Sequence, residues 1–124
     1  MSISNFLENT LLDLVFNASA YAGQSTVYVQ LHVGDPGETG TSNVAGETTR
    51  KAVTFAGAVG GSVVSDSAAT WASVAAAETY THISLWDAAS GGNCLWTGSL
   101  TSDTAVALGQ AFTLASGDLT ASLD

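Results

Sequence analysis

The sequence TVYVQLHV at residues 26–33 decides the fold class of this chain. Its apolar residues alternate with Tyr28, Gln30 and His32, so the two sets point to opposite faces of an extended backbone. Alternation over this length is typical of a half-buried β-strand and not of a helix. A second stretch, YTHISLW at residues 80–86, alternates in the same way and predicts its even-numbered residues on one face and its odd-numbered residues on the other.

Further short stretches with strand character follow one another along the chain, separated by Gly, Ser, Asn and Asp turns. This pattern predicts an all-β fold: an antiparallel β-sandwich or jelly-roll-like single domain with a short N-terminal α-helix. The predicted strands are residues 26–33, 52–55, 62–64, 68–71, 80–86, 95–100, 111–115 and 119–123.

The connections between these strands carry recognisable turn residues. Asp35-Pro36-Gly37 fits a turn with proline pre-set at its second position, and SGGN at residues 90–93 fits a hairpin link between Trp86 and Trp96. Residues 116–118 predict a terminal hairpin of the last two strands, with residues 118–124 on or beside a sheet edge. The loop of residues 34–49 is too long for a tight hairpin, and loops of that length usually carry binding or assembly contacts.

The segment of residues 4–16 is the one good helix candidate. Ser4 or Asn5 can cap it, and Glu8 lies near the positive end of the helix dipole. Its apolar surface is wider than one stripe, so the helix either packs across the domain's own sheet or docks onto a neighbouring subunit. Its apolar residues are Ile3, Phe6, Leu7, Leu11, Leu12, Leu14, Val15 and Phe16.

The predicted organisation is a helix and linker at residues 1–22 followed by the β-sandwich at residues 23–124, as one structural unit. The N-terminus has no basic residue ahead of its apolar run, so it lacks the positive region of a secretory signal, and we expect the chain to be made in the cytoplasm.

The charge balance bounds the choice of partners. Of the 124 residues only 10% are charged, and eleven acids against two bases give a net charge of −9. This charge disfavours nucleic acid and anionic membrane surfaces as partners, because phosphate binding depends on clustered Lys and Arg. The acids can also serve only to keep a sparsely charged protein in solution.

A search for catalytic, metal and cofactor residues finds no convincing set, so we expect no enzyme activity and no cofactor. His32 and His82 could approach each other on neighbouring strands, but a metal site would need further ligands such as Asp35 or Asp87. A histidine bonded to a carbonyl or stacked on Tyr80 explains the pattern as well. The single cysteine, Cys94, is expected to be a buried and inert thiol.

Three further features admit a binding role beside a structural one. Asp35, Glu38 and Glu47 could offer oxygen ligands to calcium, although a solvated acidic loop is the commoner case. Arg50 could pair with an acid across an interface or be a plain surface residue. The aromatic residues, which could either stack on sugars or pack in the core, are Tyr21, Tyr28, Trp71, Tyr80, Trp86 and Trp96.

Four segments carry a resemblance that covers about residues 27–124. They are LHVGDPG at residues 31–37, RKAVTF at 50–55, THISLWDAASGGNCLW at 81–96 and LTASL at 119–123. In their order and spacing they resemble a family of small virion proteins of tailed bacteriophages, whose members are described as head decoration (cement) proteins or as tail-fibre proteins.

The resemblance implies a structural protein of the virion. A single compact domain without a shaft, together with the negative charge, favours a capsid decoration protein that stabilises the head shell. Its implied partners are the major capsid protein and itself, as a homotrimer on the outer surface of the capsid. The alternative is a tail-fibre or tail-tip module that recognises host surface glycans. The residues expected at subunit or capsid contacts are Phe6, Leu7, Leu11, Asp35, Glu38 and Arg50.

Overall fold

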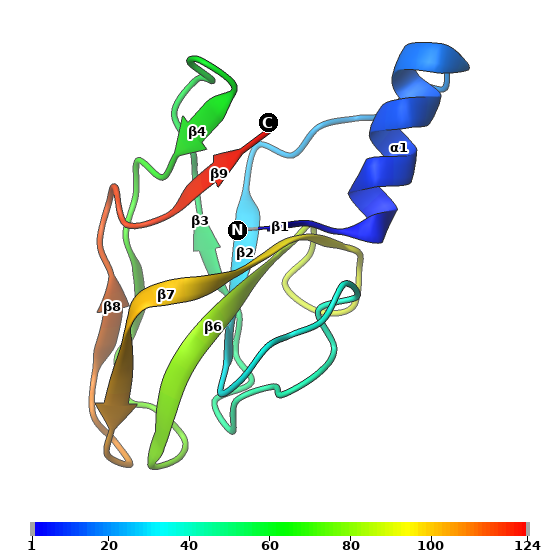
Figure 1. The fold of residues 1–124 in the computed structure, drawn as a ribbon. Coiled ribbons are helices and arrows are strands. Elements are labelled where there is room, and N and C mark those ends of the chain that lie inside the picture. The colour runs from blue at the N-terminus through cyan, green and yellow to red at the C-terminus, as the bar shows by residue number, and fades with distance from the viewer. Residues whose placement is uncertain (1, 124) are drawn as a thin grey trace.

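In the computed structural model, which describes residues 2–123, five antiparallel strands form the larger layer of the fold (Figure 1). Each strand pairs with a neighbour that lies antiparallel to it. From one edge to the other the order is β1 (Ser2–Ile3), β7 (Cys94–Val106), β6 (Glu78–Trp86), β2 (Val27–His32) and β3 (Lys51–Val53).

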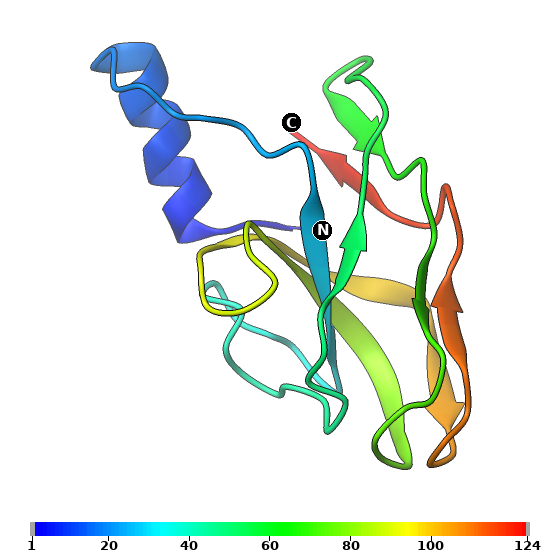
Figure 2. The same cartoon turned by 180° about the vertical axis from the view of Figure 1, so that it is seen from behind.

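Two further strand pairs form the second layer. β4 (Ser62–Val64) pairs with β9 (Thr120–Ser122), and β5 (Ala69–Trp71) pairs with β8 (Phe112–Leu114). Seen from behind, the two pairs follow one another along one side of the molecule (Figure 2). The predicted antiparallel β-sandwich with one N-terminal helix is therefore confirmed.

The core lies between these two layers. The alternation that predicts β2 places Val29 and Leu31 in it, fully buried, and β6 contributes Ile83. From the second layer Trp71 and Phe112 meet them, with their ring centroids 5.8 Å apart. Removing such large apolar surfaces from water is the main favourable term in the stability of the fold.

The face expected for Tyr80 is wrong. Even-numbered residues of β6 were predicted to lie together, but Tyr80 is fully buried in the core, where its ring lies 5.0 Å from that of Phe112. The reason is a register shift: Tyr80 pairs with Thr104, whereas His82 pairs with Ser99. The extra residues of β7 form a bulge there, and a bulge re-aims the side chains on either side of it. Burial raises the pKa of Tyr80 to about 12.

The predicted terminal hairpin is also wrong, although its turn exists. Gly117 has φ +90°, and Asp118 accepts a hydrogen bond from the backbone N–H of Ala115. However, β8 pairs with β5 and β9 pairs with β4, so the last two strands do not pair with each other. The backbone of Ser65 bonds both Gly117 and Leu119, and it thereby joins the two pairs end to end. Within the described residues β9 has one strand neighbour, as expected of an edge, and Asp124 lies outside them.

The helix α1 (Asn5–Phe16) forms as predicted, with Ser4 as its N-cap. Ser4 also belongs to the sheet, because its N–H donates to Leu95 O at 3.0 Å and its hydroxyl donates to Cys94 O. The preceding residues form β1, a strand that was not predicted, so the chain joins the edge of the large sheet before the helix begins. Across residues 2–123, no helix has the length and apolar character needed to cross a membrane.

Candidate functional site

The distal half of α1 is the most exposed apolar segment of the molecule. Its sequence LLDLVF, residues 11–16, is apolar at every position except Asp13. Leu7 is the one buried residue of the helix, while Val15 is 71% exposed and Phe16 is 77% exposed. Figure 1 shows the helix projecting from the body, attached at its N-terminal end. Packing of the whole helix across the domain's own sheet is therefore not what the structure shows.

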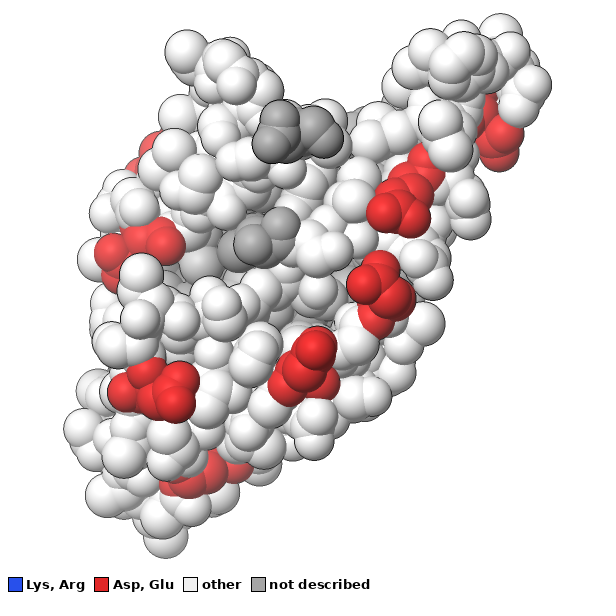
Figure 3. Space-filling model, in the orientation of Figure 1, with Lys and Arg blue, Asp and Glu red and all other residues white. Residues whose placement is uncertain are grey.

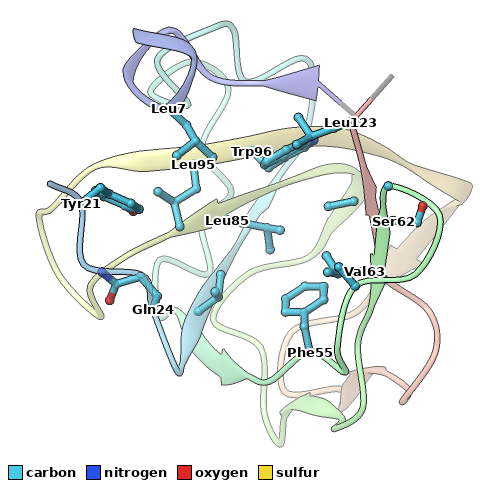
Figure 4. A pocket seen from close by; sticks show the side chains of 14 residues that line it. Leu7, Tyr21, Gln24, Phe55, Ser62, Val63, Leu85, Leu95, Trp96 and Leu123 are labelled. Carbon is cyan, nitrogen blue, oxygen red and sulfur yellow. The ribbon is translucent and has the colours of Figure 1, made fainter. Parts of the chain in front are cut away.

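An apolar groove of about 370 Å³ lies at the base of this helix. Figure 4 shows Leu7 and Tyr21 on one side of it and Val63 and Leu123 on the other, with Trp96 beside Leu123. No charged side chain lines the groove, whose residues all fall within the described range. The lining residues are Leu7, Tyr21, Gln24, Val27, Phe55, Ala58, Gly61, Ser62, Val63, Leu85, Leu95, Trp96, Ala121 and Leu123.

The groove exists because its two sides cannot meet. The linker after α1 brings Tyr21 against Phe6, whose ring centroid is 6.5 Å away in an edge-to-face arrangement. On the far side, β4 and β9 pair with each other and not with the large sheet. Trp96 lies between these two sides of the groove, and its buried indole N–H has no hydrogen-bond acceptor among residues 2–123. A buried donor without an acceptor is costly, so this indole N–H lowers the stability of the fold at the floor of the groove.

The three helix residues predicted for subunit contacts differ in how exposed they are. Leu7 is packed within its own chain, Leu11 is half-buried, and Phe6 is partly exposed beside Tyr21. The more exposed apolar residues are Val15 and Phe16, which the prediction did not include. The sequence signal for these two residues was that residues 11–16 place apolar side chains on nearly every side of the helix. A helix that is apolar all round is normally buried.

The long loop is held in place by many internal bonds. Asp35 accepts from the N–H of Gly37 at 2.9 Å, which makes the predicted turn, and Pro36 between them is fully buried. Further along, Ala45 donates its N–H to Leu31 O. Of the predicted contact residues in this loop, Asp35 and Glu38 remain at its surface, so their role in assembly stays a prediction.

Arg50 makes contacts within its own chain that join β2 to the β6–β7 connection. Its guanidinium lies 3.9 Å from the centroid of the Trp86 ring, and its Nε donates to Gln30 Oε1 at 3.1 Å. One terminal nitrogen donates to Ala88 O at 2.8 Å and to Gly91 O at 2.7 Å. The planar, five-donor guanidinium suits this combination of stacking and carbonyl contacts. These contacts give Arg50 a structural role in its own chain, and its predicted intermolecular role stays untested.

His32 and His82 are directly opposite each other in the β2–β6 pair. His32 is fully buried, with Nδ1 2.9 Å from Ser42 O and Nε2 2.7 Å from Ser84 Oγ. The Trp86 indole N–H donates to the same Ser84 hydroxyl at 2.7 Å. Because a carbonyl only accepts, Nδ1 carries the proton, and Nε2 accepts from Ser84. This chain of bonds explains His32, and residues 2–123 contain no group of three side chains suited to a metal ion.

The buried position of His32 predicts a dependence of stability on pH. Burial, as the largest cause, lowers the pKa of His32 below its ordinary value of 6.5. Below about pH 6.5 the unfolded state then binds more protons than the folded state. The contribution of neutral His32 to the free energy of unfolding is therefore complete above about pH 6.5 and is lost as the pH falls through the folded pKa. The difference in unfolding free energy between the native chain and His32→Gln should shrink from pH 7 to pH 5, by up to about 1.4 kcal/mol per pH unit. Urea unfolding at both values measures it, and a difference that does not change with pH contradicts the prediction.

Cys94 is buried as expected, and burial raises the pKa of its thiol to about 11, so little thiolate forms at neutral pH. The aromatic residues are mostly used inside the fold: Trp71 and Tyr80 lie in the core, and Trp86 lies under Arg50. Glu47 of the acidic loop is buried, and its carboxylate accepts from the N–H of Thr49 at 3.1 Å.

Comparison with known proteins gives one finding. A family model described as podophage GP4 fiber I protein gp80 matches residues 2–122, which is nearly the whole chain. No curated protein matches the chain.

Proposed function

Because the chain belongs to the podophage GP4 fiber I protein gp80 family, and is thus a structural component of a phage virion fibre, we propose that it is a fibre module joined to other subunits through its helix end. The family description favours a fibre protein over the capsid decoration protein expected from the sequence. The expected homotrimer belongs to this proposal, and a contact with the major capsid protein has no further support.

The distribution of apolar and charged surface is the observation that carries the proposal. Exposed apolar side chains concentrate on α1 and around the groove, where Phe16, Val15, Val59 and Leu123 are all more than half exposed. Figure 3 shows acidic residues spaced over this face, α1 included, with no basic residue visible, so the uncharged surface consists of the apolar side chains between them. Subunits that all carry a net charge of −9 repel one another except where uncharged surfaces meet.

The apolar area supports an assembly contact more than a chance exposure. Fully burying an aliphatic or aromatic side chain contributes about 1.5–3 kcal/mol, so four such residues offer several kcal/mol before the costs of association. Isolated helices as short as α1 are marginal in water, and most of their stability in proteins comes from packing of their apolar face. The exposed half of α1 thus gains order as well as burial when a subunit covers it.

Glycan recognition receives less support than assembly. A sugar-stacking platform needs exposed aromatic faces, but Trp71, Tyr80 and Trp86 are buried. The other three aromatic residues of the prediction, Tyr21, Tyr28 and Trp96, are half-buried. We therefore keep the assembly role as the proposal and treat host recognition as an outcome that binding experiments would reveal.

Gold-labelled antibodies raised against the purified chain test the proposal on intact virions. We expect the label on fibres, at a few to a few dozen copies per particle. Label spread evenly over the head, at hundreds of copies, would show a decoration protein instead. Particles grown from a phage lacking the coding sequence provide the control for unspecific label.

A further inference from the structure

The apolar tip of α1 and the apolar groove lie on the same chain, yet they do not meet. Leu12, Val15 and Phe16 are absent from the groove lining, although Leu7 of the same helix is part of it. With a rise of 1.5 Å per residue, Phe16 lies about 13 Å along the helix from Leu7. The helix cannot fold back into its own groove unless the bonds of Ser4 to β7 and the packing of Leu7 are broken.

We propose that the tip of α1, defined as Leu12, Val15 and Phe16, lies in the groove of a second copy of this chain. This inference rests on the proposed function, since it names the partner of the helix end. Residues i, i+3 and i+4 lie together on one helix face, so the three side chains form one ridge. The occupant of the groove is thus a neighbouring fibre subunit.

Charge favours this pairing. Neither the ridge nor the groove contains a charged residue, so two strongly acidic chains can meet there without placing carboxylates against each other. Asp13 lies beside the ridge, where its carboxylate accepts from the side-chain amide of Asn17 at 2.7 Å.

The ridge and the groove supply the apolar centre of an interface and not its whole area. A phenylalanine buries about 150–250 Å², and Phe16 is 77% exposed, so this residue alone can cover about 100 Å² or more. A stable interface buries about 800 Å² per partner. Each subunit in a closed ring contributes one ridge and one groove, so it uses both apolar surfaces at once. Two different surfaces meet in such a contact, and it closes into a ring if the rotation between subunits is right, as in the expected homotrimer.

Disulfide trapping between two single-cysteine variants tests the pairing directly. Phe16→Cys and Leu123→Cys place thiols on the ridge and at the groove, both at exposed positions. When the two purified chains are mixed under mild oxidation, we expect a disulfide dimer that contains one chain of each kind. Phe16→Cys alone should give at least tenfold less dimer. Cys94 is buried and contributes no competing disulfide.

Leu108→Cys is the matched control, because Leu108 is 71% exposed but lies in the β7–β8 connection, at the other end of the fold (Figure 1). Mixed with Phe16→Cys, it should give no trapped dimer. Dimers of Phe16→Cys alone in amounts equal to the mixed pair would indicate helix-to-helix packing and overturn the proposal, and so would the absence of any ridge-to-groove dimer.

The oligomeric state gives a second readout. Sedimentation of the native chain should show an oligomer. Phe16→Asp should lower its association constant at least tenfold, and Leu108→Asp should leave that constant unchanged, while both variants keep their strand content. A native chain that stays monomeric overturns the inference. Antibody labelling measures the location on the virion separately. If the disulfide dimer forms but the label lies on the head, only the proposed function is contradicted. If the label lies on the fibres but no disulfide dimer forms, only this inference is contradicted.

Discussion

Replacing Gly40 by alanine lowers the free energy of unfolding by about 2–5 kcal/mol. Gly40 has φ +70°, a left-handed conformation that costs an L-residue about 1–2 kcal/mol. A Cβ at this position would also lie 2.6 Å from the sulfur of Cys94 and 3.1 Å from the Trp86 ring. Overpacking of this kind costs about 1–3 kcal/mol more. Urea unfolding followed by tryptophan fluorescence measures the sum.

Gly37→Ala is the matched control for this prediction. Gly37 has nearly the same φ, +72°, but its added Cβ would meet nothing closer than Ser42 Oγ at 3.7 Å. It should therefore show the conformational cost alone, about 1–2 kcal/mol. Equal losses for the two variants would mean that the loop is not packed against Cys94. Partial rescue of Gly40→Ala by Cys94→Ala would confirm the contact as the cause.

Replacing Arg50 by methionine lowers the free energy of unfolding by about 2–4 kcal/mol, which is large for a partly exposed residue that directly precedes β3. The change removes the bonds to Gln30, Ala88 and Gly91 together with the stacking on Trp86. Hydrogen bonds of charged groups contribute about 1.5–3 kcal/mol each when buried, and stacking of a cation on an aromatic ring adds about 0.5–1 kcal/mol, but partial exposure reduces both. Hydrogen exchange of residues 87–93 should become faster in the variant.

Lys51→Met controls for the charge, because it removes the same single positive charge from the neighbouring residue. We expect a loss below about 0.5 kcal/mol, as is usual for surface substitutions. Comparable losses for both variants would show that net charge, and not the contacts of Arg50, stabilises the fold.

The sequence predicts most of the strands because their signal is local. Alternation at residues 26–33 and the turn residues at 90–93 need no knowledge of distant contacts, and both appear in the structure as β2 and the β6–β7 connection. Pairing was harder to predict, since it depends on residues far apart in the chain. The backbone of Ser65 directs β8 and β9 to different partners, and nothing in the sequence of residues 111–123 indicates this.

The exposed apolar surface that we propose for assembly was predicted in part. Residues 11–16 are apolar on nearly every side, which predicts burial, but their sequence does not say whether that burial is within the chain. The answer depends on where the helix is attached, and the attachment comes from Ser4 and β1, whose contacts with β7 span about 90 residues of sequence. The groove was not predictable, because its lining comes from six separate segments of the chain: residues 7, 21–27, 55–63, 85, 95–96 and 121–123.

The most direct measurement of the central claim is a density map of the virion fibre at a resolution that shows side chains. The account predicts that each copy meets its neighbour through α1, with Val15 and Phe16 enclosed by protein and the acidic faces turned to solvent. A map in which α1 projects freely into solvent, while neighbouring copies meet elsewhere, would contradict it.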